Sequence, residues 1–320
     1  MSSLTEAISK PIHLSYIKDC LRDVRLGALA NAGVSYLIHE YNVWKNNSNG
    51  VIKPTTLYME LTTKCPRECK DCYISVEDRL DPEIISIENV DKIMQNCETQ
   101  GIRVYTLLGG EPMMKETLPI IKYLLHKHPL KTFVACTNGD YIANQKDKLD
   151  DILLKNNFIA ALSVDGFQET NDELRGRNSF KNVMESASYL KSIRSFYGSI
   201  ITLRQENYME ATSIAFRDLL VSKGFKFLSF AFPSRLTQET IDEAIHNIES
   251  WKDEHIMVYT GLFGHLGNHD NHTMAKVVSM DKRGRILKKR RERIEIGDTD
   301  TSLDAVSNNP IWRERYEHQM

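Results

Sequence analysis

Apolar and polar positions follow a regular order along most of the chain. Six short apolar runs predict strands, and they span residues 57–61, 104–110, 131–137, 158–164, 199–203 and 225–232. Segments with apolar residues at helical spacing lie between them, at 88–99, 116–127, 145–155, 180–193 and 208–222. Strands that alternate with helices in this way form parallel sheets through right-handed crossovers. The pattern therefore predicts an α/β fold, a partial (β/α)6 TIM-like barrel that lacks two units of the closed form.

Two further segments flank the predicted barrel. Residues 17–44 carry a loose apolar stripe at helical spacing, which predicts a helical N-terminal extension that packs on the flank of the barrel. Residues 237–256 predict another amphipathic helix, and the composition after it becomes rich in Gly, His and Asn, then basic, then polar. We therefore divide the chain into an extension over 1–52, a barrel over 53–235 and a C-terminal helix with a tail over 236–320.

Composition narrows the class of protein. Hydrophobic residues make up 41% of the chain and the formal net charge is −2, so we expect no general attraction to nucleic acid or anionic membranes. No stretch reaches the roughly 20 apolar residues that span a bilayer, and the N-terminus lacks the apolar segment of a secretory signal. Half of the six cysteines lie in one cluster, which is typical of a reduced cytoplasmic protein. The others, Cys20, Cys97 and Cys136, lie in apolar segments, where we expect small buried side chains.

The cysteine cluster follows the first predicted strand. The sequence "KCPRECKDCY" at 64–73 contains Cys65, Cys69 and Cys72. Three thiols exceed the need of one disulfide and fall short of the four ligands of a structural zinc site. Thiolate sulfur also favours iron–sulfur clusters, and three thiolates on a [4Fe-4S] cube would leave one iron open. The position fits such chemistry, because parallel α/β proteins collect functional residues at the carboxyl ends of their strands.

The spacing of Cys65, Cys69 and Cys72 resembles the motif of the radical S-adenosylmethionine (SAM) superfamily. Further landmarks follow at the ends of the next three predicted strands: "GGEP" at 109–112, "TNG" at 137–139 and "SVDG" at 163–166, and then "DELRG" with Arg175. Each of these alone is an ordinary turn sequence, so their joint order over about 56–235 carries the resemblance.

The resemblance implies one [4Fe-4S] cluster on Cys65, Cys69 and Cys72, with SAM bound to the open iron. Glu111 would then accept a hydrogen bond from the ammonium group of SAM. Gly109 and Gly110 would let the backbone approach this ligand closely, because glycine has no Cβ.

Further cofactor contacts are expected from polar side chains near the ends of later strands. Asn138, Ser163 and Asp165 suit contacts with the ribose or carboxylate of SAM. Arg175 or Arg204 could hold the SAM carboxylate as a planar donor fork.

The resemblance also implies a reaction. The enzyme would cleave SAM reductively to a 5′-deoxyadenosyl radical. This radical would abstract hydrogen from a peptide or from a small metabolite, phosphorylated or not, in a biosynthetic or tailoring pathway. An external one-electron donor of flavodoxin or ferredoxin type would supply the electron. The alternative is a non-catalytic iron–sulfur or metal-binding redox sensor derived from the same fold, and a plain zinc protein comes third.

The chain departs from the family pattern in the loop and in the tail. Asp71 stands where an aromatic residue usually precedes the third cysteine, Tyr73 follows that cysteine instead, and Arg67 occupies a position that is more often apolar. Residues 277–317 resemble the SPASM or twitch extension of some members, but no cysteine follows Cys136, so we expect no auxiliary clusters. Without that electron acceptor, a redox-neutral or externally reduced step is favoured over a net two-electron oxidation.

Two polar clusters in the C-terminal part have more than one interpretation. His265, His269 and His272 repeat the spacing of the cysteines and could bind a metal, but neutral imidazoles lining a substrate pocket are our preferred interpretation. Residues 282–293 hold eight Lys or Arg and one Glu. They could bind phosphate groups or nucleic acid, but no interleaved aromatic residues accompany them, and we expect a solvated hairpin face and no nucleic-acid partner.

Overall fold

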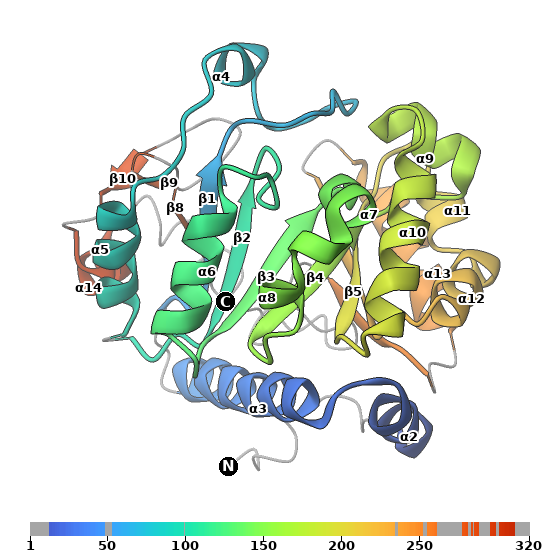
Figure 1. Ribbon diagram of the computed structural model, residues 1–320, viewed down its shortest axis with the longest axis horizontal. Helices are drawn as coiled ribbons and strands as arrows, with labels where there is room; N and C mark the ends of the chain where they lie inside the picture. The colour runs from blue at the N-terminus through green and yellow to red at the C-terminus, as the bar shows by residue number, and fades with distance from the viewer. Residues whose placement is uncertain are drawn as a thin grey trace.

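A computed structural model shows one sheet flanked by helices (Figure 1). It describes residues 13–48, 53–98, 100–233, 236–251, 255–260, 277–280, 283, 285–287, 295–298 and 301–310. The ten described strands have the order β10-β9-β8-β1-β2-β3-β4-β5-β6-β7. All neighbouring pairs from β8 to β7 are parallel, and the two pairs that include β9 are antiparallel.

The six predicted strands are present, each within two residues of its predicted ends. They are β1 (Thr56–Thr62), β2 (Val104–Gly109), β3 (Thr132–Thr137), β4 (Phe158–Ser163), β5 (Tyr197–Thr202) and β6 (Phe227–Ala231). They pair in chain order and run parallel, which confirms the predicted α/β class. A seventh parallel strand, β7 (Met257–Thr260), pairs with β6 and was not predicted.

The helix predicted over 237–256 is wrong at its C-terminal end. The observed helix α13 (Gln238–Glu249) stops seven residues earlier. Trp251 follows it, and its ring lies in the core with its centroid 5.9 Å from that of Phe230. The indole nitrogen of Trp251 donates a hydrogen bond to the carbonyl of Thr212 at 3.1 Å. The buried Trp251 thus lies just beyond the end of α13, at a position where the sequence predicts a continued helix.

Further helices connect the strands. They are α4 (Val76–Leu80), α5 (Ile87–Glu98), α6 (Leu118–Lys127), α7 (Asp140–Gln145), the 3-10 turn η1 (Lys146–Lys148), α8 (Asp150–Leu153), α9 (Gln168–Arg175), α10 (Ser179–Ser192), α11 (Tyr208–Ala211) and α12 (Ile214–Ser222). The segments predicted as single helices at 145–155 and 208–222 are each broken. In the second, the Ser213 side chain accepts a hydrogen bond from the Phe216 amide and so begins α12 as an N-cap.

The main core lies between the sheet and the outer helices. Leu57, Met59 and Leu61 of β1 are fully buried and alternate with residues of the opposite face, as a pleated strand requires. Burying each such side chain stabilises the fold by about 1.5–3 kcal/mol. Cys97 belongs to this core as predicted, whereas Cys136 is only half-buried.

The N-terminal helices α2 (Leu14–Asp23) and α3 (Leu26–Ser48) close the amino ends of the strands. Figure 1 shows α3 across those ends, opposite the loop that follows β1. Their buried residues, which include Tyr16, Cys20 and Val24, pack with alternate residues of the inner face such as Val134 and Ile159. The extension was predicted to lie on the flank of the barrel. It covers the amino ends of the strands instead, because its apolar stripe packs on these inner-face residues.

The described part of the tail extends the sheet beyond β1. It contains β8 (Val277–Met280), which pairs with β1, then β9 (Ile286–Leu287), β10 (Glu295–Gly297) and α14 (Leu303–Asn308). The three histidines His265, His269 and His272 and most of the basic run lie outside the described residues. Within that run, Arg283 pairs with Glu83 at 2.7 Å. None of the helices in the described residues has the length and hydrophobicity needed to span a lipid bilayer.

Candidate active site at the carboxyl ends of the strands

The three clustered cysteines lie in the loop that follows β1. Cys65, Cys69 and Cys72 are all free and half-buried. Burial raises the pKa of Cys65 to about 12 and also raises that of Cys69, so these thiols carry their protons unless a cation binds them. In the described part of the chain, no group of three or more His, Cys, Asp or Glu side chains is arranged to hold a metal ion.

Two hydrogen bonds at Lys70 anchor this loop directly after Cys69. The Lys70 amide donates to the carbonyl of Leu174 at 2.8 Å, and the Lys70 carbonyl accepts from Nη2 of Arg204 at 3.2 Å. Asp71 has φ 57°, a left-handed conformation that Asp tolerates better than bulkier residues. This conformation gives a physical reason for Asp at a position where the family usually has an aromatic residue.

The two glycines at the end of β2 lie directly against the backbone around the end of β1. Two backbone hydrogen bonds make the contact. The Gly110 amide donates to the Thr62 carbonyl at 2.7 Å, and the amide of the next residue, Glu111, donates to the Lys64 carbonyl at 2.8 Å. A Cβ at Gly109 would lie 2.0 Å from the Thr62 carbonyl oxygen, and one at Gly110 would lie 2.1 Å from that of Lys64. The contact that requires glycine here is therefore with the start of the cysteine loop, in addition to any contact with a ligand.

Glu111 ties the end of β2 to the end of β3. One carboxylate oxygen accepts from the Met113 amide at 2.9 Å and from the Thr137 hydroxyl at 2.6 Å, and the other accepts from the Asn138 amide at 2.7 Å. The side chain is 2% exposed, and burial raises its pKa to about 7 against the opposing effect of these hydrogen bonds. The "TNG" segment is thus a partner of the "GGEP" segment, which its residue types alone did not indicate.

Asp165 joins the two predicted arginines. Its carboxylate accepts from Nη2 of Arg175 at 2.8 Å, from Arg204 at 2.6 Å and from the Thr202 amide at 2.8 Å, and Nε of Arg175 forms an ion pair with it at 2.7 Å. Burial opposes its charge, but the two guanidinium groups outweigh that effect and lower the pKa of Asp165. All of its acceptor positions are used within the protein, so Asp165 holds the arginines in place.

Asn138 and Ser163 complete the set of predicted residues at this edge. Both side chains are buried. The Asn138 carboxamide oxygen accepts from the Asp140 amide at 2.9 Å, while its nitrogen Nδ2 is buried without a hydrogen-bond partner among the described residues. A buried donor of this kind costs about 1–3 kcal/mol unless a ligand or water satisfies it. Free thiols, an open amide donor and buried charges therefore meet at the carboxyl ends of β1 to β4, a donor set that fits an iron–sulfur cluster with a polar cofactor beside it.

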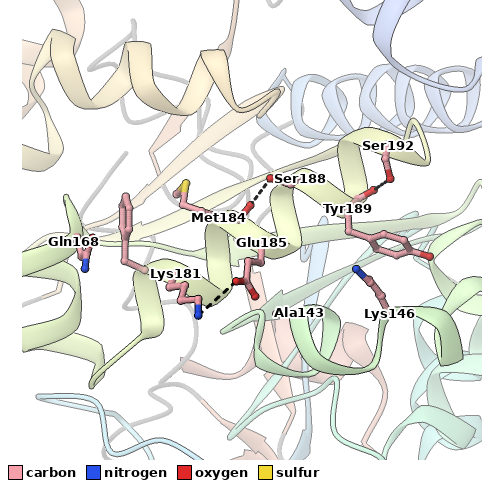
Figure 2. Close-up of a pocket in the computed structure, with 10 residues that line it drawn as sticks. Ala143, Lys146, Gln168, Lys181, Met184, Glu185, Ser188, Tyr189 and Ser192 are labelled. Atoms are coloured by element: carbon pink, nitrogen blue, oxygen red, sulfur yellow. Dashed lines mark hydrogen bonds and ion pairs between the residues drawn. The ribbon is translucent and has the colours of Figure 1, made fainter.

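A groove of about 590 Å³ lies elsewhere, on the outer helical face between α7, α9 and α10. Figure 2 shows Lys181 and Glu185 paired along its edge and Lys146 beside Tyr189. None of the predicted site residues lines this groove. It is separate from the strand ends, and sequence reasoning gave no sign of it.

The fold and the site define an α/β domain with a three-cysteine loop at the carboxyl edge of a parallel sheet. Residues 59–216 match the family model described as the Radical SAM superfamily. The chain therefore contains a radical SAM domain, and members of this superfamily use a [4Fe-4S] cluster and SAM.

Curated relatives match parts of the chain. The sporulation killing factor maturation protein SkfB of Bacillus subtilis is 27% identical over 229 residues, which cover 63% of this chain and 53% of SkfB. A probable GTP 3′,8-cyclase of Methanococcus maripaludis is 26% identical over 93 residues, which cover 29% of this chain and 31% of the cyclase. The matches thus span about a third to a half of the length of these relatives.

Solved structures share the fold over most of the chain. SuiB of Streptococcus suis bound to S-adenosylmethionine superposes with a TM-score of 0.64 at 16% identity, covering 85% of this chain and 70% of SuiB. Native anSMEcpe with bound AdoMet gives a TM-score of 0.63 at 17% identity, with 83% and 84% covered. These similarities confirm the TIM-like α/β architecture.

Proposed function

We propose that this protein is a radical SAM enzyme that holds one [4Fe-4S] cluster on Cys65, Cys69 and Cys72, with SAM beside it. The observation that carries the proposal is the meeting of three free, half-buried thiols in one loop with Glu111 and Asn138 from the next two strand ends. When bound, the cluster and SAM would supply radical chemistry that removes a hydrogen atom from the substrate, with the electron coming from an external donor of ferredoxin or flavodoxin type.

The residues at the strand ends would bind and orient SAM. Glu111 accepts three hydrogen bonds from the protein, and a carboxylate has about four acceptor positions, so one is left for the ammonium group. Nδ2 of Asn138, which has no partner among the described residues, would donate to the cofactor. Arg175 uses Nε and Nη2 on Asp165, which leaves Nη1 for the carboxylate of SAM.

A peptide is the substrate class we propose first. SkfB is named for maturation of a sporulation killing factor, and SuiB has been crystallised with its precursor peptide SuiA. A small phosphorylated metabolite is the second candidate, supported by the partial match to a probable GTP 3′,8-cyclase.

The sequence has no cysteine after Cys136 to bind an auxiliary cluster that could accept electrons. This favours a redox-neutral or externally reduced reaction over a net two-electron oxidation. We place the enzyme in the cytoplasm, since none of its six cysteines forms a disulfide with another.

Formation of 5′-deoxyadenosine tests the proposal. The protein is reconstituted with iron and sulfide without oxygen, supplied with SAM and dithionite, and the product is quantified by liquid chromatography and mass spectrometry. We expect 5′-deoxyadenosine from the wild type and none from Cys69→Ala. An intact cluster that yields no 5′-deoxyadenosine would instead support the redox sensor, and zinc without iron in metal analysis would support the zinc protein.

A further inference from the structure

Arg67 lies between the first two cysteines of the loop, and its side chain is only 9% exposed. Its Nε donates to Oδ2 of Asp140 at 2.7 Å, and its Nη2 donates to Oδ1, so the two groups form a bidentate ion pair. Asp140 is the first residue of α7, and Asn182 of α10 donates to the same carboxylate at 2.7 Å. The pair therefore connects the cysteine loop to two helices that pack on each other.

The remaining nitrogen of Arg67 binds the end of α9. Nη1 donates to the carbonyls of Arg175 and Gly176 at 3.2 Å and lies 3.5 Å from that of Arg177. Carbonyls at a helix C-terminus lack partners within the helix and carry its negative dipole end, so an arginine there is favourable. The Arg175 carbonyl also accepts from Sγ of Cys69 at 3.9 Å. Arg67 and Cys69 thus share one anchoring point.

From these contacts we propose that Arg67 is a positioning residue, which holds the Cys65–Cys69 part of the loop against α7 and the end of α9 while these cysteines bind the cluster. An apolar side chain at this position could pack but could not bind both Asp140 and the end of α9. Bidentate Arg–carboxylate pairs add geometric specificity as well as energy, and residues that orient metal ligands typically change metal affinity 10–100-fold when they are removed. This inference rests on the proposed function, because it concerns the same cluster.

Two variants break the same ion pair from opposite sides. Arg67→Met removes the guanidinium, and Asp140→Asn keeps the size of the carboxylate while removing its charge. If Arg67 acts through position, both variants should release iron faster to a chelator, by about tenfold. If it acts through charge alone, the two should change iron release in opposite directions. The double variant should release iron no faster than the faster single variant, because both substitutions remove the same ion pair.

Arg25→Met is the matched control. Arg25 is also partly buried and also donates to backbone carbonyls, those of Leu153 and Ile193, but it lies between α2 and α3 at the opposite ends of the strands. We expect its iron release to stay within twofold of the wild type. The unfolding of the iron-free proteins is measured in parallel, since a purely structural role would lower their stability and leave iron release from the folded fraction unchanged.

The readouts are the rate of iron release from the reconstituted protein and the EPR spectrum of its reduced cluster. Faster release and a changed spectrum in both Arg67→Met and Asp140→Asn support the inference, and Asp140→Asn alone suffices if Arg67→Met does not fold. Release rates equal to those of the wild type and of Arg25→Met would overturn it. A wild type that takes up no iron would contradict the proposed function, whereas variants that keep their iron contradict only the role of Arg67.

Discussion

The carboxylate of Glu111 accepts a hydrogen bond from the backbone amide of Asn138 at 2.7 Å, which joins the ends of β2 and β3 through a buried acid. The bond places the one ionisable group of the "GGEP" segment against the segment that follows the next strand. Because burial raises its pKa to about 7, this acid changes its charge in the range where most enzymes work.

Replacing Glu111 should change how stability depends on pH. The folded-state pKa of Glu111 is about 7 against an ordinary 4.5, so protonation stabilises the folded protein. That contribution is complete below about pH 4.5 and is lost as the pH rises through 7, a change of about 3 kcal/mol. The unfolding free energy of the iron-free wild type, measured with urea, should therefore fall by this amount relative to Glu111→Gln between pH 4.5 and 8. Parallel curves for the two proteins would contradict the buried position of the acid.

Alanine at Gly110 should disturb the contact between β2 and the cysteine loop. The new Cβ would lie 2.1 Å from the Lys64 carbonyl oxygen, so the loop must shift. We expect a loss of about 1–3 kcal/mol in unfolding free energy, together with faster iron release. Gly33→Ala is the control, since that glycine lies within α3 and a Cβ there meets no atom of the described residues within 4 Å. It should stabilise the protein by about 0.5–1 kcal/mol, and equal losses in both variants would refute the argument.

Removing the charge of Asp165 should be costly. Asp165→Asn leaves the guanidinium groups of Arg175 and Arg204 in the interior without their carboxylate. Breaking a buried ion pair from one side costs about 3–5 kcal/mol. Asp218→Asn, which breaks the exposed pair with Arg217, should cost no more than about 1 kcal/mol. Chemical denaturation of the iron-free proteins measures both, and a small effect at Asp165 would mean that the arginines have other partners.

Local pattern predicted the parallel strands well. Runs such as 158–164 combine apolar residues with flanking turn residues, and strand β4 matches that run closely. The extra strand β7 was missed because it has only four residues and follows an amphipathic helix directly in the pattern. Its pairing with β6 is a tertiary contact, which no local periodicity contains.

The residue types and positions of the candidate site could be predicted from the sequence, but the contacts between these residues could not. The cysteines, Glu111 and Asn138 were identified because they follow successive strands, which parallel sheets bring to one edge. The ion pair between Arg67 and Asp140 joins residues 73 positions apart, and no spacing rule links them. For the same reason the contact of the N-terminal helices with the amino ends of the strands could not be inferred from their apolar stripe alone.

The central claim is that three cysteines hold one cluster and leave one iron for SAM. The most direct measurement is the EPR spectrum of the dithionite-reduced, anaerobically reconstituted protein before and after SAM is added, with Cys65→Ala, Cys69→Ala and Cys72→Ala beside it. We predict the signal of a reduced [4Fe-4S] cluster that changes when SAM binds, and loss of the cluster in each variant. A wild-type signal that SAM leaves unchanged, or a protein without iron, would contradict the account.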